Sequence, residues 1–129
     1  MANIIVESTP MPKTTREDCS EVKRVELHMH TQMSQMDAMT PCSDLIKRAI
    51  SWGWESIAIT DHGVMYGAID FYKACKKEGI KPIIGCEVYT AARSLSDKDP
   101  NYDKSQGHLV LLAENMTGYQ NLIKMVSKS

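Results

Sequence analysis

Segments typical of β-strands alternate with segments typical of helices from residue 25 onward. The four segments with strand character cover residues 25–30, 56–60, 80–89 and 108–113. Segments with helical spacing of apolar residues cover residues 40–53, 66–78 and about 119 to 129. This alternation is typical of α/β folds in which the strands pair mainly in parallel. The sequence therefore predicts an α/β fold with about four mainly parallel strands and three helices, the second of which should end at Gly79.

The length of 129 residues suits one domain and is too short for two. Residues 1–22 have no regular hydrophobic pattern and include Pro10 and Pro12, so we expect a flexible arm or linker there and the domain in residues 23–129. A complete eight-stranded barrel needs ~250 residues. The domain could therefore be a small open sheet or part of a larger barrel. In the second case we expect the isolated chain to be marginally stable or to self-associate through an unpaired sheet edge.

The overall composition argues against several classes of protein. A hydrophobic content of 43% is typical of a globular domain, and a formal net charge of −1 does not provide the basic surface of a stand-alone nucleic-acid-binding protein. Bound metal ions could still supply positive charge for a phosphoester. The sequence has no evident signal peptide or membrane-spanning run, and no CxxC pair among its four cysteines, Cys19, Cys42, Cys75 and Cys86. We therefore expect free thiols in a cytoplasmic protein without a membrane partner.

Candidate metal ligands lie at the ends of successive predicted strands. His28 and His30 are two residues apart on the first predicted strand, so both side chains should project from the same face. His62 and Glu87 follow at the ends of the next two predicted strands, where functional side chains of parallel strands converge. Asp37 falls in the loop after the first strand.

His108, at the start of the fourth predicted strand, completes a set of four histidines and two carboxylates. Imidazole combined with carboxylate is a ligand mixture suited to zinc, manganese or iron. An HxH pair or a Thr-Asp-His triplet is weak evidence by itself, and Cys86 is better explained as a small core residue than as a ligand. The placement of the whole set on successive strands predicts a metal site.

Three blocks of this sequence resemble a known family. ELHMHTQMSQMDA, Glu26–Ala38, resembles the opening motif of the polymerase-and-histidinol-phosphatase (PHP) family, in the form found in PolC-type alpha subunits of bacterial DNA polymerase III. AITDHGVMYGAIDFYKACKKEGIKPIIGCEVY, Ala58–Tyr89, and HLVLLAENMTGYQNLIKMVSKS, His108–Ser129, resemble the PHP domain of DnaE-type alpha subunits. The resemblance covers about residues 23–129 and leaves the subtype open.

The resemblance implies a distorted (β/α)7 barrel, of which this chain would supply the N-terminal part, with a site for up to three divalent ions such as zinc, manganese or iron. Carried over by position, the early metal ligands would be His28, His30, Asp37, His62, Glu87 and His108. Asp37 and His62 would also be catalytic, acting through a metal-bound water. The later ligands of the family are expected beyond Ser129. Because histidine must lose its proton to bind metal, we expect metal affinity to fall below about pH 6.

The same resemblance implies metal-dependent phosphoester hydrolysis of the 3′–5′ exonuclease or pyrophosphatase type. The parent protein would be a DNA-directed DNA polymerase that contacts DNA, and that contacts replisome subunits such as the sliding clamp through regions outside this chain. This fragment alone is expected to be inactive. Two alternatives remain open from the sequence: a stand-alone PHP-family phosphoesterase, and a metal-binding module with a purely structural role.

Overall fold

A computed structural model of the chain describes residues 16–129. Most of the flexible arm expected at residues 1–22 lies outside the described residues. Residues 16–22, the part of that arm that is described, form neither helix nor strand. Within residues 16–129, no helix combines the length and the apolar character needed to cross a bilayer.

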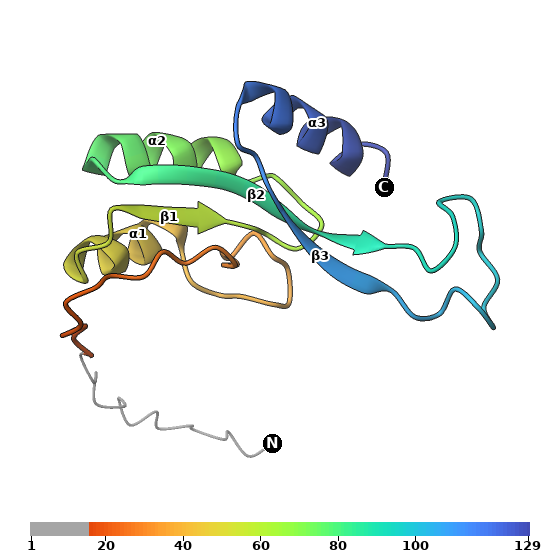
Figure 1. Ribbon diagram of the computed structural model, residues 1–129, viewed down its shortest axis with the longest axis horizontal. Coiled ribbons are helices and arrows are strands. Elements are labelled where there is room, and N and C mark those ends of the chain that lie inside the picture. The colour runs from red at the N-terminus through yellow and green to blue at the C-terminus, as the bar shows by residue number, and fades with distance from the viewer. Residues whose placement is uncertain (1–15) are drawn as a thin grey trace, which may run out of the picture.

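Residues 16–129 contain three helices and three strands, which alternate up to β2 and are followed by β3 and α3 (Figure 1). The elements are α1 (Cys42–Ser51), β1 (Ser56–Ile59), α2 (Ala68–Glu78), β2 (Lys81–Thr90), β3 (Gly107–Leu112) and α3 (Met116–Val126). Helix α2 ends as expected, because Gly79 adopts the left-handed conformation with φ +78° and its N–H reaches the carbonyl of Cys75. The predicted α/β fold is confirmed, with three strands rather than four.

The sheet has the strand order β1-β2-β3 and is mixed. Strand β1 pairs in parallel with β2, and Ile59 lies opposite Ile84. Strand β3 pairs with β2 in the antiparallel direction, with Gly85 opposite Leu112. The connection between β2 and β3 contains no helix, and a parallel return would need such a crossover. The expectation of mainly parallel pairing therefore holds for β1 and β2 but not for β3.

The predicted first strand, residues 25–30, is an extended segment beside β1 and does not form a regular ladder. Its backbone accepts two hydrogen bonds from β1 and the residue after it, from Ala58 N to Glu26 O (3.0 Å) and from Thr60 N to Met29 O (2.9 Å). The Thr60 hydroxyl replaces a third ladder bond by accepting from Met29 N at 2.7 Å. The uneven spacing of these contacts explains why four predicted strands become three, although the segment still runs along the edge of the sheet.

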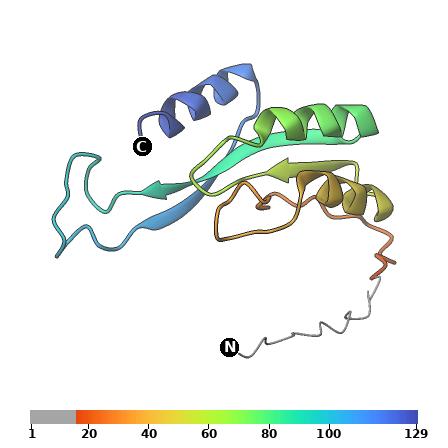
Figure 2. The same ribbon diagram turned by 180° about the vertical axis from the view of Figure 1, so that it is seen from behind.

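Helices α1 and α2 cover the same face of the sheet, behind the strands in Figure 1 and in front of them in Figure 2. The buried core between them consists of Ile46, Ala49, Ile57, Ile59, Phe71, Cys75 and Ile80. Residues 31–41 and residues 60–67 lie at the end of the core where β1 ends, and the β2–β3 connection, residues 91–106, extends away from it (Figure 1). Strand β1 ends at Ile59 opposite Ile84, whereas β2 continues to Thr90, so the residues that follow β1 lie beside the C-terminal half of β2.

Candidate metal centre

Glu87 lies near the end of β2 and is buried, with 4% of its surface exposed. The chain that leaves β1 continues beside it, because Glu87 N donates to Asp61 O at 3.1 Å and Gly63 N donates to Glu87 O at 2.7 Å. These two bonds form an isolated parallel bridge between His62 and Glu87. The backbone therefore fixes His62 next to Glu87 before any side-chain contact is considered.

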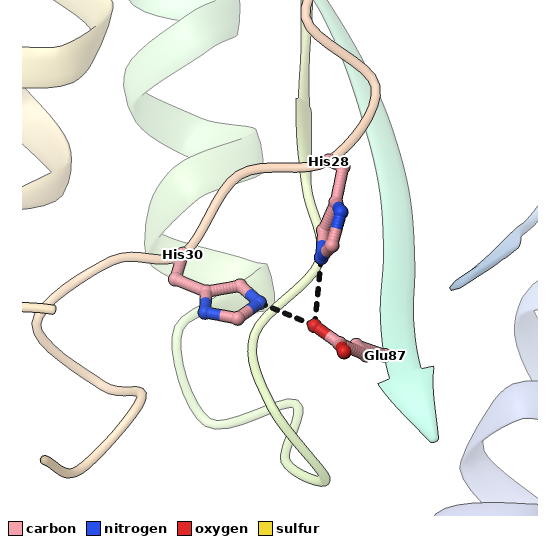
Figure 3. Close-up of side chains that lie close together, drawn as sticks. All are labelled: His28, His30 and Glu87. Carbon is pink, nitrogen blue, oxygen red and sulfur yellow. Dashed lines mark hydrogen bonds and ion pairs between the residues drawn. The ribbon is translucent and has the colours of Figure 1, made fainter. Parts of the chain in front are cut away.

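Three imidazoles donate hydrogen bonds to the Glu87 carboxylate. Oε2 accepts from Nε2 of His28 at 2.7 Å and from Nε2 of His30 at 2.6 Å, as Figure 3 shows. Oε1 accepts from Nδ1 of His108 at 2.6 Å. His28 and His30 come from the N-terminal segment and His108 from β3. Both oxygens of one buried carboxylate thus hold histidines from opposite sides of β2.

The charge of Glu87 is set by two opposing effects. Burial raises the pKa of its carboxyl group, but the hydrogen bonds from His28, His108 and His30 outweigh burial and lower the pKa from the usual 4.5 to about 2. Glu87 is therefore a carboxylate at neutral pH. A buried anion surrounded by imidazoles is an environment suited to a cation.

Asp37 and His62 form a second contact at this end of the sheet. The Nδ1 atom of His62 donates to Oδ2 of Asp37 at 2.5 Å. Asp37 is brought there by a turn in which Ser34 O accepts from Asp37 N at 3.0 Å and Met36 adopts a positive φ of 71°. The Nε2 atom of His62 is buried and has no hydrogen-bond partner among residues 16–129. A buried nitrogen with a free lone pair is costly unless something binds it.

The nitrogen and oxygen atoms of these residues form two candidate metal-binding groups that share Glu87. One group is His28, His30 and Glu87, and the other is His62, Glu87 and His108; within each group the ligand atoms lie within 4.8 Å of one another. The ring centroids of His62 and His108 are 4.8 Å apart, and those of His30 and His62 are 5.7 Å apart. The donor set of imidazole and carboxylate and the unpartnered nitrogen of His62 both fit divalent transition metals.

The structure brings all six residues expected from the sequence to one end of the sheet. Five of them belong to the two groups that share Glu87, and Asp37 reaches the centre through its contact with His62. A catalytic role for Asp37 and His62 stays a prediction. His28 and His30 face the same carboxylate even though their segment is not a regular strand.

Two residues beside the centre, Tyr89 and Asp61, were not predicted from the sequence. The Tyr89 ring packs 4.7 Å from the His62 ring and 4.8 Å from the His108 ring, measured between centroids. Tyr89 lies two residues after Glu87 on β2, so the two side chains project from the same face of the strand. This neighbour of the centre could therefore have been predicted from the sequence. Asp61 is 1% exposed and accepts hydrogen bonds from Thr31 and Ser34. Nothing in the local sequence distinguishes it from an ordinary acidic residue after a strand.

Comparison with known proteins agrees with this geometry. The family model described as the PHP domain matches residues 26–129. The DNA polymerase III alpha subunits of Chlamydia pneumoniae and Borreliella burgdorferi are 44% and 46% identical to this chain over 104 and 106 residues, which is 80% and 81% of the chain. The Helicobacter pylori subunit is 47% identical over 78% of the chain. The chain spans only 8–9% of the length of these relatives.

Solved structures share the fold at low sequence identity. An amidohydrolase from Chromobacterium violaceum, with sulfate bound and no metal, has a TM-score of 0.54 and 23% identity, over 78% of this chain and 32% of its own. A candidate metal-dependent phosphoesterase from Bifidobacterium adolescentis has a TM-score of 0.53 and 18% identity, again over 78% of this chain and 32% of its own. The α/β arrangement described above therefore corresponds to about a third of each larger chain. The family model matches most of the length of this chain. The chain therefore belongs to the PHP domain family, in the form found in the N-terminal region of bacterial DNA polymerase III alpha subunits.

Proposed function

We propose that this chain is part of a bacterial DNA polymerase III alpha subunit and that its PHP domain binds divalent metal ions and hydrolyses phosphoesters. Identity of 44–47% over about four fifths of the chain supports the polymerase parent. DNA synthesis in the cytoplasm, and contacts with DNA and with replisome subunits such as the sliding clamp, would then belong to the whole protein. Substrates of the PHP site would be a DNA 3′ end or pyrophosphate.

The observation that carries the proposal is the arrangement around Glu87. A single buried carboxylate uses both of its oxygens to contact His28, His30 and His108, and the unpartnered Nε2 of His62 lies in the same cluster. Four histidines collected around one carboxylate have no evident role in packing. A shared carboxylate between two groups of imidazoles is the arrangement expected for a centre with more than one metal ion.

Each residue would have a separate task in such a centre. His28 and His30 would hold one ion with Glu87, and His62 and His108 would hold another with the same carboxylate. Asp37 would orient the His62 ring by accepting a hydrogen bond from its Nδ1–H, which leaves Nε2 as the ligand atom. Zinc, manganese or iron, with up to three ions in the complete domain, would supply Lewis acidity for the attack of water on a phosphoester.

A matched pair of variants tests the proposal. Glu87→Gln removes the shared carboxylate, whereas Glu78→Gln makes the same chemical change on the exposed end of α2. In the full-length subunit, Glu87→Gln should abolish manganese- or zinc-dependent release of nucleotides from a DNA 3′ end or of phosphate from pyrophosphate. It should also weaken metal binding by roughly 100-fold or more, and Glu78→Gln should change neither. Metal binding that survives Glu87→Gln unchanged would refute the proposed centre.

A structural role for the metals is supported by a separate observation. The segment of residues 25–30 has only a few backbone contacts to the sheet, and the contacts of His28 and His30 with Glu87 supplement them. Metal ions at these positions would attach the segment to β2. Under this alternative, metal raises the melting temperature of the full-length subunit, His28→Ala removes that increase, and neither substrate is hydrolysed at any metal concentration.

A further inference from the structure

Asp61 is a buried acidic residue beside the candidate centre that is not in contact with any of its ligands through its side chain. Asp61 is 1% exposed, and its carboxylate accepts three hydrogen bonds. Oδ1 accepts from Thr31 N at 2.6 Å and from the Ser34 hydroxyl at 2.9 Å, and Oδ2 accepts from the Thr31 hydroxyl at 2.9 Å. Among the described residues, no lysine or arginine forms an ion pair with it. A buried carboxylate without a cation is costly unless its hydrogen bonds serve a purpose.

The partners of Asp61 are the residues that shape the turn leading to Asp37. Thr31 and Ser34 are both 0% exposed. Ser34 O accepts from Asp37 N at 3.0 Å and from Ala38 N at 3.2 Å, so the position of Ser34 determines the position of Asp37. The Asp61 carboxylate accepts hydrogen bonds from both buried residues of this turn, Thr31 and Ser34, and so fixes its conformation.

The same carboxylate is connected to His62 through Ser34. The Ser34 hydroxyl donates to Asp61 and accepts from His62 N at 3.0 Å. The backbone carbonyl of Asp61 accepts from Glu87 N, so the residue also fixes the strand that carries Glu87. Asp61 therefore links three separate parts of the chain: the turn with Asp37, the residue His62 and strand β2.

We propose that Asp61 is a positioning residue for the metal centre, acting through Thr31 and Ser34 to hold Asp37 against Nδ1 of His62. The inference rests on the proposed metal-binding function. Loss of the Asp61 carboxylate would free the turn of residues 31–37, release the His62 ring from Asp37 and weaken the group His62, Glu87 and His108. The group His28, His30 and Glu87 should be affected less, because Glu26 O and Met29 O still accept from Ala58 N and Thr60 N and keep this segment beside β1.

Two substitutions of Asp61 separate positioning from general stabilisation. Asp61→Ala removes both acceptor oxygens and, with them, all three hydrogen bonds. Asp61→Asn keeps one oxygen for Thr31 N and Ser34, and its amide can donate to the Thr31 hydroxyl, so the geometry survives without the charge. Phe71→Leu is the control, because it damages the buried core away from the metal ligands. Each variant is made in the full-length subunit and titrated with Mn²⁺ and Zn²⁺ by calorimetry at a temperature where circular dichroism shows it to be folded.

The wild-type full-length subunit is expected to bind at least two equivalents of metal. Asp61→Ala should lose ~10–100-fold in affinity for one equivalent and keep the other, Asp61→Asn should remain within a few-fold of wild type, and Phe71→Leu should lower only the melting temperature. A folded Asp61→Ala variant that binds every equivalent as the wild type does would overturn the inference. If that variant does not fold, Ser34→Ala, which removes the link between Asp61 and His62, must show the same selective loss, and unchanged binding would overturn the inference equally. Failure of the wild-type chain itself to bind metal would instead refute the proposed function on which the inference depends.

Discussion

The Nδ1 atom of His62 donates to Oδ2 of Asp37 over 2.5 Å, while the Nε2 atom of the same ring is buried and has no partner in the part of the chain that the structure describes. A carboxylate that holds one nitrogen of an imidazole fixes both the tautomer and the orientation of the ring. The other nitrogen then presents its lone pair in a defined direction. In the proposed centre, this contact would orient Nε2 of His62 toward a metal ion.

Replacing Asp37 tests this relationship directly. Asp37→Asn removes the charge that selects the Nδ1–H tautomer of His62, and the affinity for Mn²⁺ or Zn²⁺ should fall ~10–100-fold. Asp70→Asn, on the exposed face of α2, is the matched control and should leave the affinity unchanged. Calorimetric titration of both variants provides the comparison. Equal affinities in the two variants would show that Asp37 does not orient His62.

Metal binding should depend strongly on pH. Imidazole binds metal only when it has lost its proton, and four histidines surround the centre. We expect affinity for Zn²⁺ to be highest above neutral pH and to decrease steeply below about pH 6. Titrations at a series of pH values should show more than one proton released for each metal bound. A flat pH profile would exclude the histidines as ligands.

The free energy of unfolding of the metal-free protein should depend on pH in a lower range, below about pH 4.5. The folded state lowers the pKa of Glu87 from 4.5 to about 2, so the folded protein binds fewer protons there than the unfolded chain. The resulting stabilisation, on the order of 2–3 kcal/mol, is complete above about pH 4.5 and is lost as pH falls toward 2. Urea unfolding in the presence of a chelator measures the free energy of unfolding at each pH. As pH falls from 4.5 toward 2, this free energy should decrease more steeply for wild type and Glu78→Gln than for Glu87→Gln. Parallel curves for all three proteins would contradict the lowered pKa.

Strand β2 requires a glycine at position 85. A Cβ atom there would lie 2.5 Å from Leu111 O and 2.7 Å from Leu112 Cδ2, so β3 would have to move away. Gly85→Ala should lower the free energy of unfolding by roughly 1–3 kcal/mol. Gly118→Ala, in helix α3 with no contact closer than 3.4 Å, should instead raise it by roughly 0.5–1 kcal/mol. Chemical denaturation distinguishes the two, and equal effects would indicate that β3 approaches β2 less closely.

The cysteines should differ widely in reactivity. All four thiols are free, which confirms the expectation from the sequence, but only Cys19 is exposed. Burial raises the pKa of Cys42 to about 11 and that of Cys75 to about 12, and it also raises the pKa of Cys86. Iodoacetamide at pH 7.5 should therefore label Cys19 first, and urea should make all four react. Mass spectrometry of the labelled peptides measures this, and rapid labelling of Cys75 in the folded chain would contradict the packing of α2.

The sequence by itself determined the helices, strands β1 and β2 and the identity of the candidate ligands. These features depend on local causes, such as the spacing of apolar residues, the glycine that ends α2 and the position of polar residues after a buried strand. The convergence of His62 and Glu87 could be predicted because the ends of parallel neighbours meet at one edge of a sheet.

Only the tertiary structure decided the state of residues 25–30, the direction of β3 and the positions of Asp61 and Tyr89 beside the candidate centre. A β-prone segment becomes a strand only if its partner offers a matching ladder, and the Thr60 hydroxyl takes one of those positions here. The direction of β3 follows from a connection without a helix, which returns the chain alongside β2. Asp61 acts on Thr31 and Ser34, about 30 residues earlier in the chain. Contacts of that kind leave no periodic pattern, because they depend on how distant segments meet in space.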